Sequence, residues 1–198
     1  VHEKISSLFR HREILLSDGR DRKIIQLSKF NHEVLTKMDY VYENYEKVID
    51  FLRIHCYCFT AEIYNNIAQS GKVPSDFLKQ YYEIIEGIPS RFIIRAPELM
   101  GEFGYRINNM LVNQSILRNQ LSIRHLYLTG ALQEHMPSGI KNILEIGGGW
   151  GGLIHHLHKF YGENSTCIIV DVPEGLYFSG MYLTAANPEK KKYLRSRR

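Results

Sequence analysis

The chain has 198 residues, of which 44% are hydrophobic and 23% are charged, a balance typical of globular proteins. It has no apolar run near the ~20 residues that a membrane-spanning helix requires, and its first residues lack the basic region and apolar stretch of a signal peptide. The net charge is +4, but the last nine residues carry six positive charges and no negative ones, and +4 less 6 leaves −2 for the remainder. We therefore expect a cytoplasmic protein of one ordinary domain or two small ones, with no nucleic-acid or membrane partner.

Residues 1–135 are expected to be mainly helical. Apolar residues recur at steps of three and four from Val41 to Ile67, which predicts one amphipathic helix of about seven turns, ended by Gly71 and Pro74. A second helix is expected from Ser75 to Ile85, capped by its first two residues. Because the long stripe exceeds what a small sheet can cover, it predicts a contact with another helix or a homodimer formed through the helical region.

The next segment is predicted to connect this region to a second domain. Residues 88–104 contain several prolines and glycines and are expected to form a connector, with one short strand from Arg91 to Arg95. A long helix is then expected from about Ile107 to Gln133, in a stretch rich in asparagine at its start. The sequence Met136–Gly139 is typical of a domain boundary.

A strand, a glycine-rich turn and a helix follow from Lys141. Ile143–Ile146 is typical of a short buried strand, Gly147–Gly152 of a tight turn, and the residues from Leu153 onward of a helix. About twenty residues later, Cys167–Asp171 resembles a second buried strand that ends in a carboxylate. This arrangement lets a backbone approach a nucleotide-like ligand and lets the carboxylate accept hydrogen bonds from ribose hydroxyls. The sequence therefore predicts a βαβ unit that binds a nucleoside-containing cofactor.

Two glycine fingerprints overlap in this turn. Gly147, Gly149 and Gly152 satisfy the dinucleotide pattern G-x-G-x-x-G, while a G-x-G-x-G pattern is satisfied when Gly151 replaces Gly152. Glu145, two positions before the first glycine, distinguishes them. In a dinucleotide-binding strand that position is normally apolar, because a buried carboxylate without a partner is costly. A carboxylate there suits a cationic or amine-bearing ligand.

These residues carry a resemblance to a known family. Leu144–Leu153, with the sequence LEIGGGWGGL, resembles the first motif of class I S-adenosylmethionine-dependent methyltransferases. Together with Ile169–Glu174, which reads IVDVPE, it is similar to the sugar O-methyltransferases of that class. Gly101–Tyr105 is also similar to the segment that precedes the cofactor domain in these proteins. The close match spans roughly residues 141–185 and a looser one spans residues 98–135.

The resemblance implies an α/β fold in two parts. A mainly α-helical N-terminal domain (residues 1–137) would precede the start of a Rossmann-like, doubly wound sheet (residues 138–198) that binds S-adenosylmethionine and ends in a basic tail. Such a sheet normally has about six strands, so the two strands expected here predict an incomplete sheet and an interrupted chain. The implied function of the whole fold is methyl transfer from S-adenosylmethionine to a sugar hydroxyl.

The resemblance also implies a set of cofactor-binding residues. The turn would lie under the methionine part of the cofactor, and the acid that ends the second strand would bind the ribose. The implied residues are Glu145, Gly147, Gly148, Gly149, Trp150, Gly151, Asp171 and Val172. The side chain of Trp150 would either cover the cofactor or pack beneath the helix. The catalytic base is not identified; Glu102, between two glycines, is either a candidate base or a turn residue.

Two other functions remain open at this point. An NAD(P)-dependent oxidoreductase would use Gly147, Gly149 and Gly152, and a non-catalytic helical interaction module would retain only a remnant of the cofactor fold. No metal site is expected, because His155 and His158 share a helix face but lack a third ligand. Solvent-facing or hydrogen-bonded histidines are the expected alternative.

Overall fold

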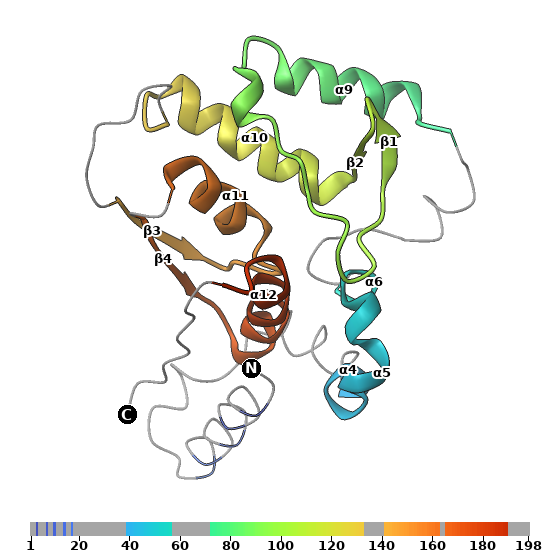
Figure 1. The fold of residues 1–198 in the computed structure, drawn as a ribbon, viewed down its shortest axis with the longest axis vertical. Coiled ribbons are helices and arrows are strands. Elements are labelled where there is room, and N and C mark those ends of the chain that lie inside the picture. Colours follow the sequence, from blue (N-terminus) through green and yellow to red (C-terminus); the bar gives the residue numbers. More distant parts are fainter. Residues whose placement is uncertain are drawn as a thin grey trace.

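The computed structural model describes residues 39–56, 72–132, 141–162 and 165–189, together with single positions between residues 3 and 17. Helices and two small sheets combine in a mixed α/β fold (Figure 1). Helix α10 (Gln114–Leu128) lies in the middle, with α9 (Ser75–Ile85) packed on one side and α11 (Gly152–Tyr161) on the other. The predicted boundary at Met136–Gly139 lies outside the described residues.

Residues 39–56 are helical, but they form several short segments. These are α4 (Asp39–Glu43), α5 (Tyr45–Val48), the 3₁₀ turn η1 (Ile49–Phe51) and α6 (Leu52–His55). The prediction of one continuous helix is therefore wrong here, and its part beyond residue 56 lies outside the described residues. The backbone N–H of Arg53 donates to the carbonyl of Met100 (2.8 Å), so a tertiary contact takes a hydrogen bond that a continuous helix would use. The stripe itself is buried as expected at Val41, Val48, Leu52 and Cys56.

Helix α9 confirms the prediction of a helix from Ser75 to Ile85. Its predicted cap is wrong, because the N-cap residue is Pro74 and no side chain caps the first turn. The other end is capped from outside. Nη1 of Arg124, on α10, donates to the carbonyls of Glu83, Ile84 and Glu86 at 3.2, 3.0 and 2.6 Å. A cation there satisfies carbonyls that the helix leaves unpaired and complements the helix dipole.

The connector contains no strand at residues 91–95, and that prediction is wrong. A 3₁₀ turn, η2 (Ser90–Phe92), is followed by extended backbone. The side chain of Gln120, on α10 and only 1% exposed, accepts from the N–H of Ile94 (2.7 Å) and donates to the carbonyl of Phe92 (3.1 Å). A buried amide thus satisfies the backbone groups that a neighbouring strand would otherwise pair.

The asparagine-rich stretch forms a hairpin and a helix cap. Strands β1 (Tyr105–Ile107) and β2 (Met110–Val112) pair antiparallel. Asn108 and Asn109 between them have φ of 49° and 62°, a left-handed conformation that asparagine tolerates better than most residues. The helix expected from Ile107 therefore begins only at Gln114, where Oδ1 of Asn113 accepts from the N–H of Ile116 (2.9 Å).

The βαβ unit is present as predicted from Lys141. Strand β3 (Lys141–Ile146), helix α11 and strand β4 (Ser165–Val170) lead to helix α12 (Pro173–Ala186), and the two strands are parallel. Among the described residues, this sheet contains these two strands. Helix α11 packs on one face of the sheet. On the other face, the apolar side chains of Leu144, Ile146, Ile168 and Val170 are exposed.

Two hydrophobic clusters hold the βαβ unit against the helices that precede it. One joins α9, the hairpin and α10 to α11, through residues such as Phe92, Leu117 and Leu157. The other joins α4–α6 to Trp150 of the glycine turn and to Tyr177, Phe178 and Tyr182 of α12. The glycine turn is therefore packed directly against the N-terminal helices.

The hairpin turn provides a test of this fold. Asn109 is exposed and left-handed, so Asn109→Gly should leave the free energy of unfolding almost unchanged, because glycine adopts positive φ without strain. Asn109→Val should lower the free energy of unfolding by about 1–2 kcal/mol through backbone strain alone. Chemical denaturation of both variants measures the difference, with Asn142→Val, at an exposed strand position, as the control. Equal stability of the two Asn109 variants would contradict the left-handed turn.

Candidate functional site

The glycine turn lies between β3 and α11, at the carboxyl end of the parallel strands. Gly147, Gly149 and Gly151 all have positive φ, of 74°, 53° and 83°. The N–H of Gly147 donates to the carbonyl of Val170 (2.8 Å), so the turn is fixed to the end of β4. A Cβ built on Gly147 would meet nothing within 4 Å. Glycine is needed there for backbone conformation, and the space beside it is open to a ligand.

Asp171, the acid at the end of β4, reaches back to the turn. Its Oδ2 accepts from the N–H of Gly149 (2.9 Å), and its Oδ1 accepts from the N–H of Val172 (2.8 Å). A Cβ on Gly175 would come within 2.4 Å of this carboxyl group, so the first turn of α12 closes over it. Each carboxylate oxygen keeps a further lone pair for another donor. The hydrogen bond to Gly149 places Asp171 beside the turn, while its binding of a ribose stays a prediction.

Glu145 lies on the face of β3 that α11 covers. Its carboxylate accepts a hydrogen bond from the backbone N–H of Ile154, in the first turn of α11. Its Oε2 is buried and has no hydrogen-bond partner among the described residues. Burial raises the pKa of Glu145 to about 7, and the nearby charge of Asp171 acts in the same direction. A positively charged ligand would stabilise the ionised form.

Trp150 is directed into the core, away from the open side of the turn. It is 5% exposed, its ring meets that of Tyr182 edge to face at 4.7 Å, and the guanidinium of Arg53 lies 3.8 Å from the ring centroid. Of the two interpretations that the sequence leaves open, packing beneath the helix describes this side chain. The other predicted cofactor residues, from Glu145 to Gly151 with Asp171 and Val172, lie together around the turn.

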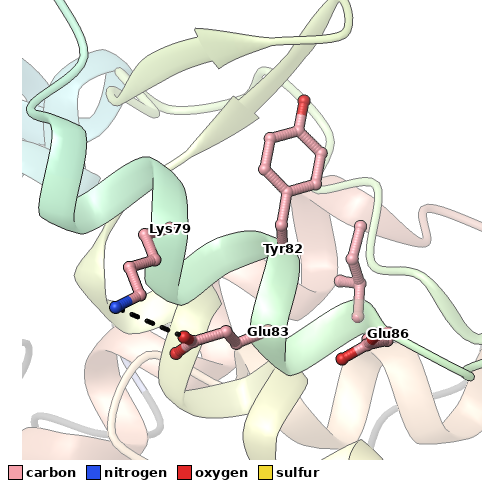
Figure 2. A pocket seen from close by; sticks show the side chains of 5 residues that line it. Lys79, Tyr82, Glu83 and Glu86 are labelled. Carbon is pink, nitrogen blue, oxygen red and sulfur yellow. Dashed lines mark ion pairs between the residues drawn. The ribbon is translucent and has the colours of Figure 1, made fainter.

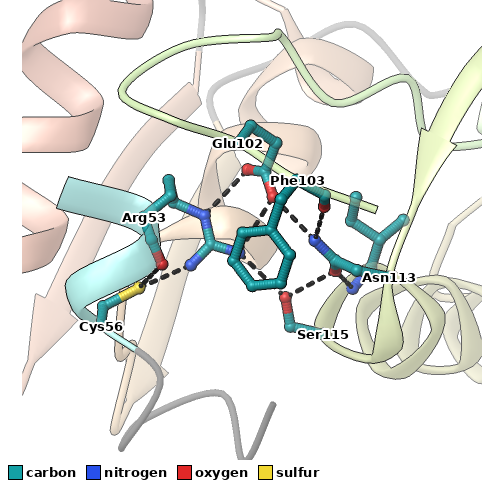
Figure 3. A network of polar contacts seen from close by, with 7 residues as sticks. Arg53, Cys56, Glu102, Phe103, Asn113 and Ser115 are labelled. Atoms are coloured by element: carbon teal, nitrogen blue, oxygen red, sulfur yellow. Dashed lines mark hydrogen bonds and ion pairs between the residues drawn. The ribbon is translucent and has the colours of Figure 1, made fainter. Parts of the chain in front are cut away.

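Glu102 belongs to a buried polar network (Figure 3). Its fully buried carboxylate pairs with Arg53 in two bonds, Nε to Oε2 at 2.8 Å and Nη2 to Oε1 at 3.1 Å. Nδ2 of Asn113 also donates to Oε1 (2.8 Å), and Ser115 accepts from Arg53 (3.1 Å). A carboxylate enclosed by these partners cannot take a proton from a methyl-acceptor substrate. Glu102 is therefore a structural residue, and its interpretation as a base is not supported.

The histidines of α11 are mostly buried. His155 and His156 are 1% and 2% exposed, so neither faces solvent. His155 is hydrogen-bonded, as the other expected alternative has it, through Nδ1 to the side-chain amide of Asn187 (3.1 Å). Burial lowers the pKa of His155 to about 4, and that of His156 falls well below its usual value. His158 contacts the hydroxyl of Ser165 (2.8 Å). Among the described residues, no three histidine, cysteine or acidic side chains gather as metal ligands.

A hollow lies on α9, lined by Lys79, Tyr82, Glu83, Ile85 and Glu86 (Figure 2). It is wide open, and Lys79 and Glu83 across it form an exposed ion pair of 3.9 Å. It includes no residue of the glycine turn. The carboxyl edge of β3 and β4 remains the candidate site, because Asp171 meets the glycine turn there and the space beside Gly147 is open.

Comparison with known proteins adds no assignment. A scan against protein-family models, a search of curated proteins and a search of solved structures each give no match. Within the part of the chain that the structure describes, no helix is both long and apolar enough to cross a membrane.

The sequence indicates the turn and both acids but does not indicate Arg53. Its partner Glu102 lies 49 positions away, and Trp150 lies farther still. The one feature of the sequence that could have indicated a buried role for Arg53 is its position within an apolar stripe, because a charge there requires a buried partner.

The pKa values predict opposing effects of pH on stability. His155 and His156 stay neutral when buried, so their stabilising contribution is present above their ordinary pKa of 6.5 and is lost as the pH falls, for His155 down to about 4. Glu145 has a raised pKa, so its contribution is present below its ordinary pKa of 4.5 and is lost as the pH rises through about 7. As the pH rises from about 4.5 to 7, the wild type loses the contribution of Glu145, whereas Glu145→Gln has no such contribution to lose. The free energy of unfolding of Glu145→Gln should therefore rise more over this range than that of the wild type.

Urea denaturation at a series of pH values measures this difference. Glu83→Gln, which removes an exposed carboxylate on α9, is the control and should follow the wild type. Parallel stability curves for the wild type and Glu145→Gln would show that Glu145 titrates at its ordinary pKa.

Proposed function

We propose that this chain carries the S-adenosylmethionine-binding part of a class I O-methyltransferase with a Rossmann-like fold. The observation that carries the proposal is the hydrogen bond from the N–H of Gly149 to Asp171. It joins the glycine turn to the acid of the second strand at one edge of a parallel strand pair, where α/β proteins bind nucleosides. Gly147, in the same turn, has open space where a Cβ would lie, which leaves room for a ligand.

Glu145 supports S-adenosylmethionine over a dinucleotide. A buried carboxylate with one unpaired oxygen is costly, and a cation beside it reduces that cost. S-adenosylmethionine brings an ammonium group and a sulfonium, whereas a dinucleotide places its negatively charged pyrophosphate over the glycine turn. The residues present therefore fit a cationic nucleoside better than an anionic one.

Each residue of the site has a distinct part in the proposed binding. Asp171, oriented by two backbone N–H groups, accepts hydrogen bonds from the ribose hydroxyls. The glycines let the backbone pass close to the methionine part, and Glu145 balances its positive charge. When bound, the cofactor supplies an electrophilic methyl group, and holding it in line with a nucleophile accounts for much of the acceleration. By resemblance to the sugar O-methyltransferases, the proposed acceptor is a sugar hydroxyl. The proposed location, as expected from the sequence, is the cytoplasm.

Calorimetric titration with S-adenosylhomocysteine and, separately, with NADH tests the cofactor. We expect the wild type to bind S-adenosylhomocysteine and not NADH. Asp171→Ala should weaken that binding by about ten- to a hundredfold, because a hydrogen bond to a charged acceptor contributes roughly 1.5–3 kcal/mol. Glu98→Ala removes a carboxylate of an exposed ion pair and is the matched control, with no expected change.

Two results would count against the proposal. Binding of NADH alone would favour the oxidoreductase alternative. Equal dissociation constants for the wild type and Asp171→Ala would exclude Asp171 as the ribose ligand.

A further inference from the structure

We propose that Arg53 is a positioning residue that holds the glycine turn in its binding conformation by stacking on Trp150. The inference rests on the proposed function, because it names the residue that fixes the turn of that same site. It assigns the N-terminal helices an indirect part in ligand binding, because α6 would hold the glycine turn in place through Trp150.

The position of Arg53 is fixed from several directions. Its backbone N–H donates to the carbonyl of Met100 (2.8 Å), and the residue is only 1% exposed. The two bonds to Glu102 set the plane of the guanidinium, and Nη1 donates to Sγ of Cys56 at 2.7 Å. Because a guanidinium is planar and its donors are fixed in direction, these partners leave it one orientation, which lies over the indole of Trp150.

The indole transmits this constraint to the turn. The ring of Trp150 covers Gly152, where an added Cβ would lie inside the ring's contact distance. Tyr182 meets the ring edge to face, so Arg53 and α12 both contact the indole. Trp150 immediately follows Gly149, whose N–H donates to Asp171. A displaced indole would therefore shift this hydrogen bond, which orients Asp171, the residue proposed to bind the ribose.

Stability alone does not explain a charged group at this position. Removing two charges from water is costly, and replacing a buried ion pair by apolar side chains of similar size is often neutral or stabilising. A guanidinium held over an aromatic face adds a directional attraction that a flexible apolar chain does not supply. The pair therefore specifies one arrangement of α6, the 99–104 segment and the glycine turn more strongly than it stabilises the fold.

The key variant is the double substitution Arg53→Met with Glu102→Gln. It removes both charges together, so no unpaired charge is left buried, and the amide still accepts from Asn113. The matched control is Arg106→Met with Glu98→Gln, which removes an exposed pair of similar geometry (2.7 Å). Arg53→Lys keeps the charge but loses the planar stack, and it serves as a second variant where the double variant does not fold.

Two measurements separate positioning from general stability. The first is the dissociation constant for S-adenosylhomocysteine, which we expect to rise about tenfold in the double variant and not in the control. The second needs no ligand: hydrogen exchange of the amides of Gly147–Gly152, measured beside those of α9. We expect faster exchange in the turn only, with α9 unchanged and the urea midpoint close to that of the wild type.

The proposal would be overturned by a folded double variant that has wild-type affinity and wild-type exchange in the turn. If the double variant does not fold, the same result in Arg53→Lys would overturn it. If the wild type does not bind S-adenosylhomocysteine, the proposed function fails, and the exchange experiment alone decides whether Arg53 positions the turn. Faster exchange confined to the turn then supports positioning, and unchanged exchange rejects it.

Discussion

The buried ion pair between Arg53 and Glu102 is the interaction on which the arrangement of this protein depends. Both side chains are removed from water, so each charge must be met by partners in fixed directions. Those partners come from separate elements: α6 supplies Arg53, the segment before the hairpin supplies Glu102, and the start of α10 supplies Asn113 and Ser115. Because the pair is satisfied only when all of them are in place, it links the position of the N-terminal helices to that of the glycine turn.

Helix α10 organises the rest of the upstream region in a similar way, through side chains that satisfy backbone groups. Asn113 caps its own helix, Gln120 pairs the extended segment after η2, and Arg124 caps α9. A buried backbone N–H or carbonyl without a partner costs free energy comparable to a lost hydrogen bond. Side chains of α10 thus satisfy backbone groups of the connector that would otherwise require a neighbouring strand. The hydrophobic cluster that includes Phe92 and Leu117 packs around the connector and α10.

The two acids at the glycine turn lie in different environments, and the difference suits different roles. Asp171 is held by two backbone N–H groups in a partly buried position, which orients it for hydroxyl donors. Glu145 is half-buried and has one buried oxygen without a partner, and burial raises its pKa to about 7, so its ionised form is favoured by a cation. Asp171 is thus oriented by hydrogen bonds, whereas Glu145 lacks a counter-charge. This difference supports the proposed ligand, which has a ribose at one end and an amine at the other.

The sequence by itself determined the elements whose information is local. The helix from Ser75 to Ile85 and the βαβ unit from Lys141 follow from apolar periodicity and from the glycines, and the joining of Asp171 to the turn follows from the rule that parallel strands end at one edge. The Asn108–Asn109 turn was not predicted, because a helix was expected from Ile107, although consecutive asparagines favour left-handed backbone between strands. Only the tertiary structure decided where the helix before residue 56 breaks, why residues 91–95 are not a strand, and what faces Trp150. In each case the deciding contact comes from a residue far away in the chain, because Met100, Gln120 and Arg53 supply hydrogen bonds or charge that no local pattern encodes.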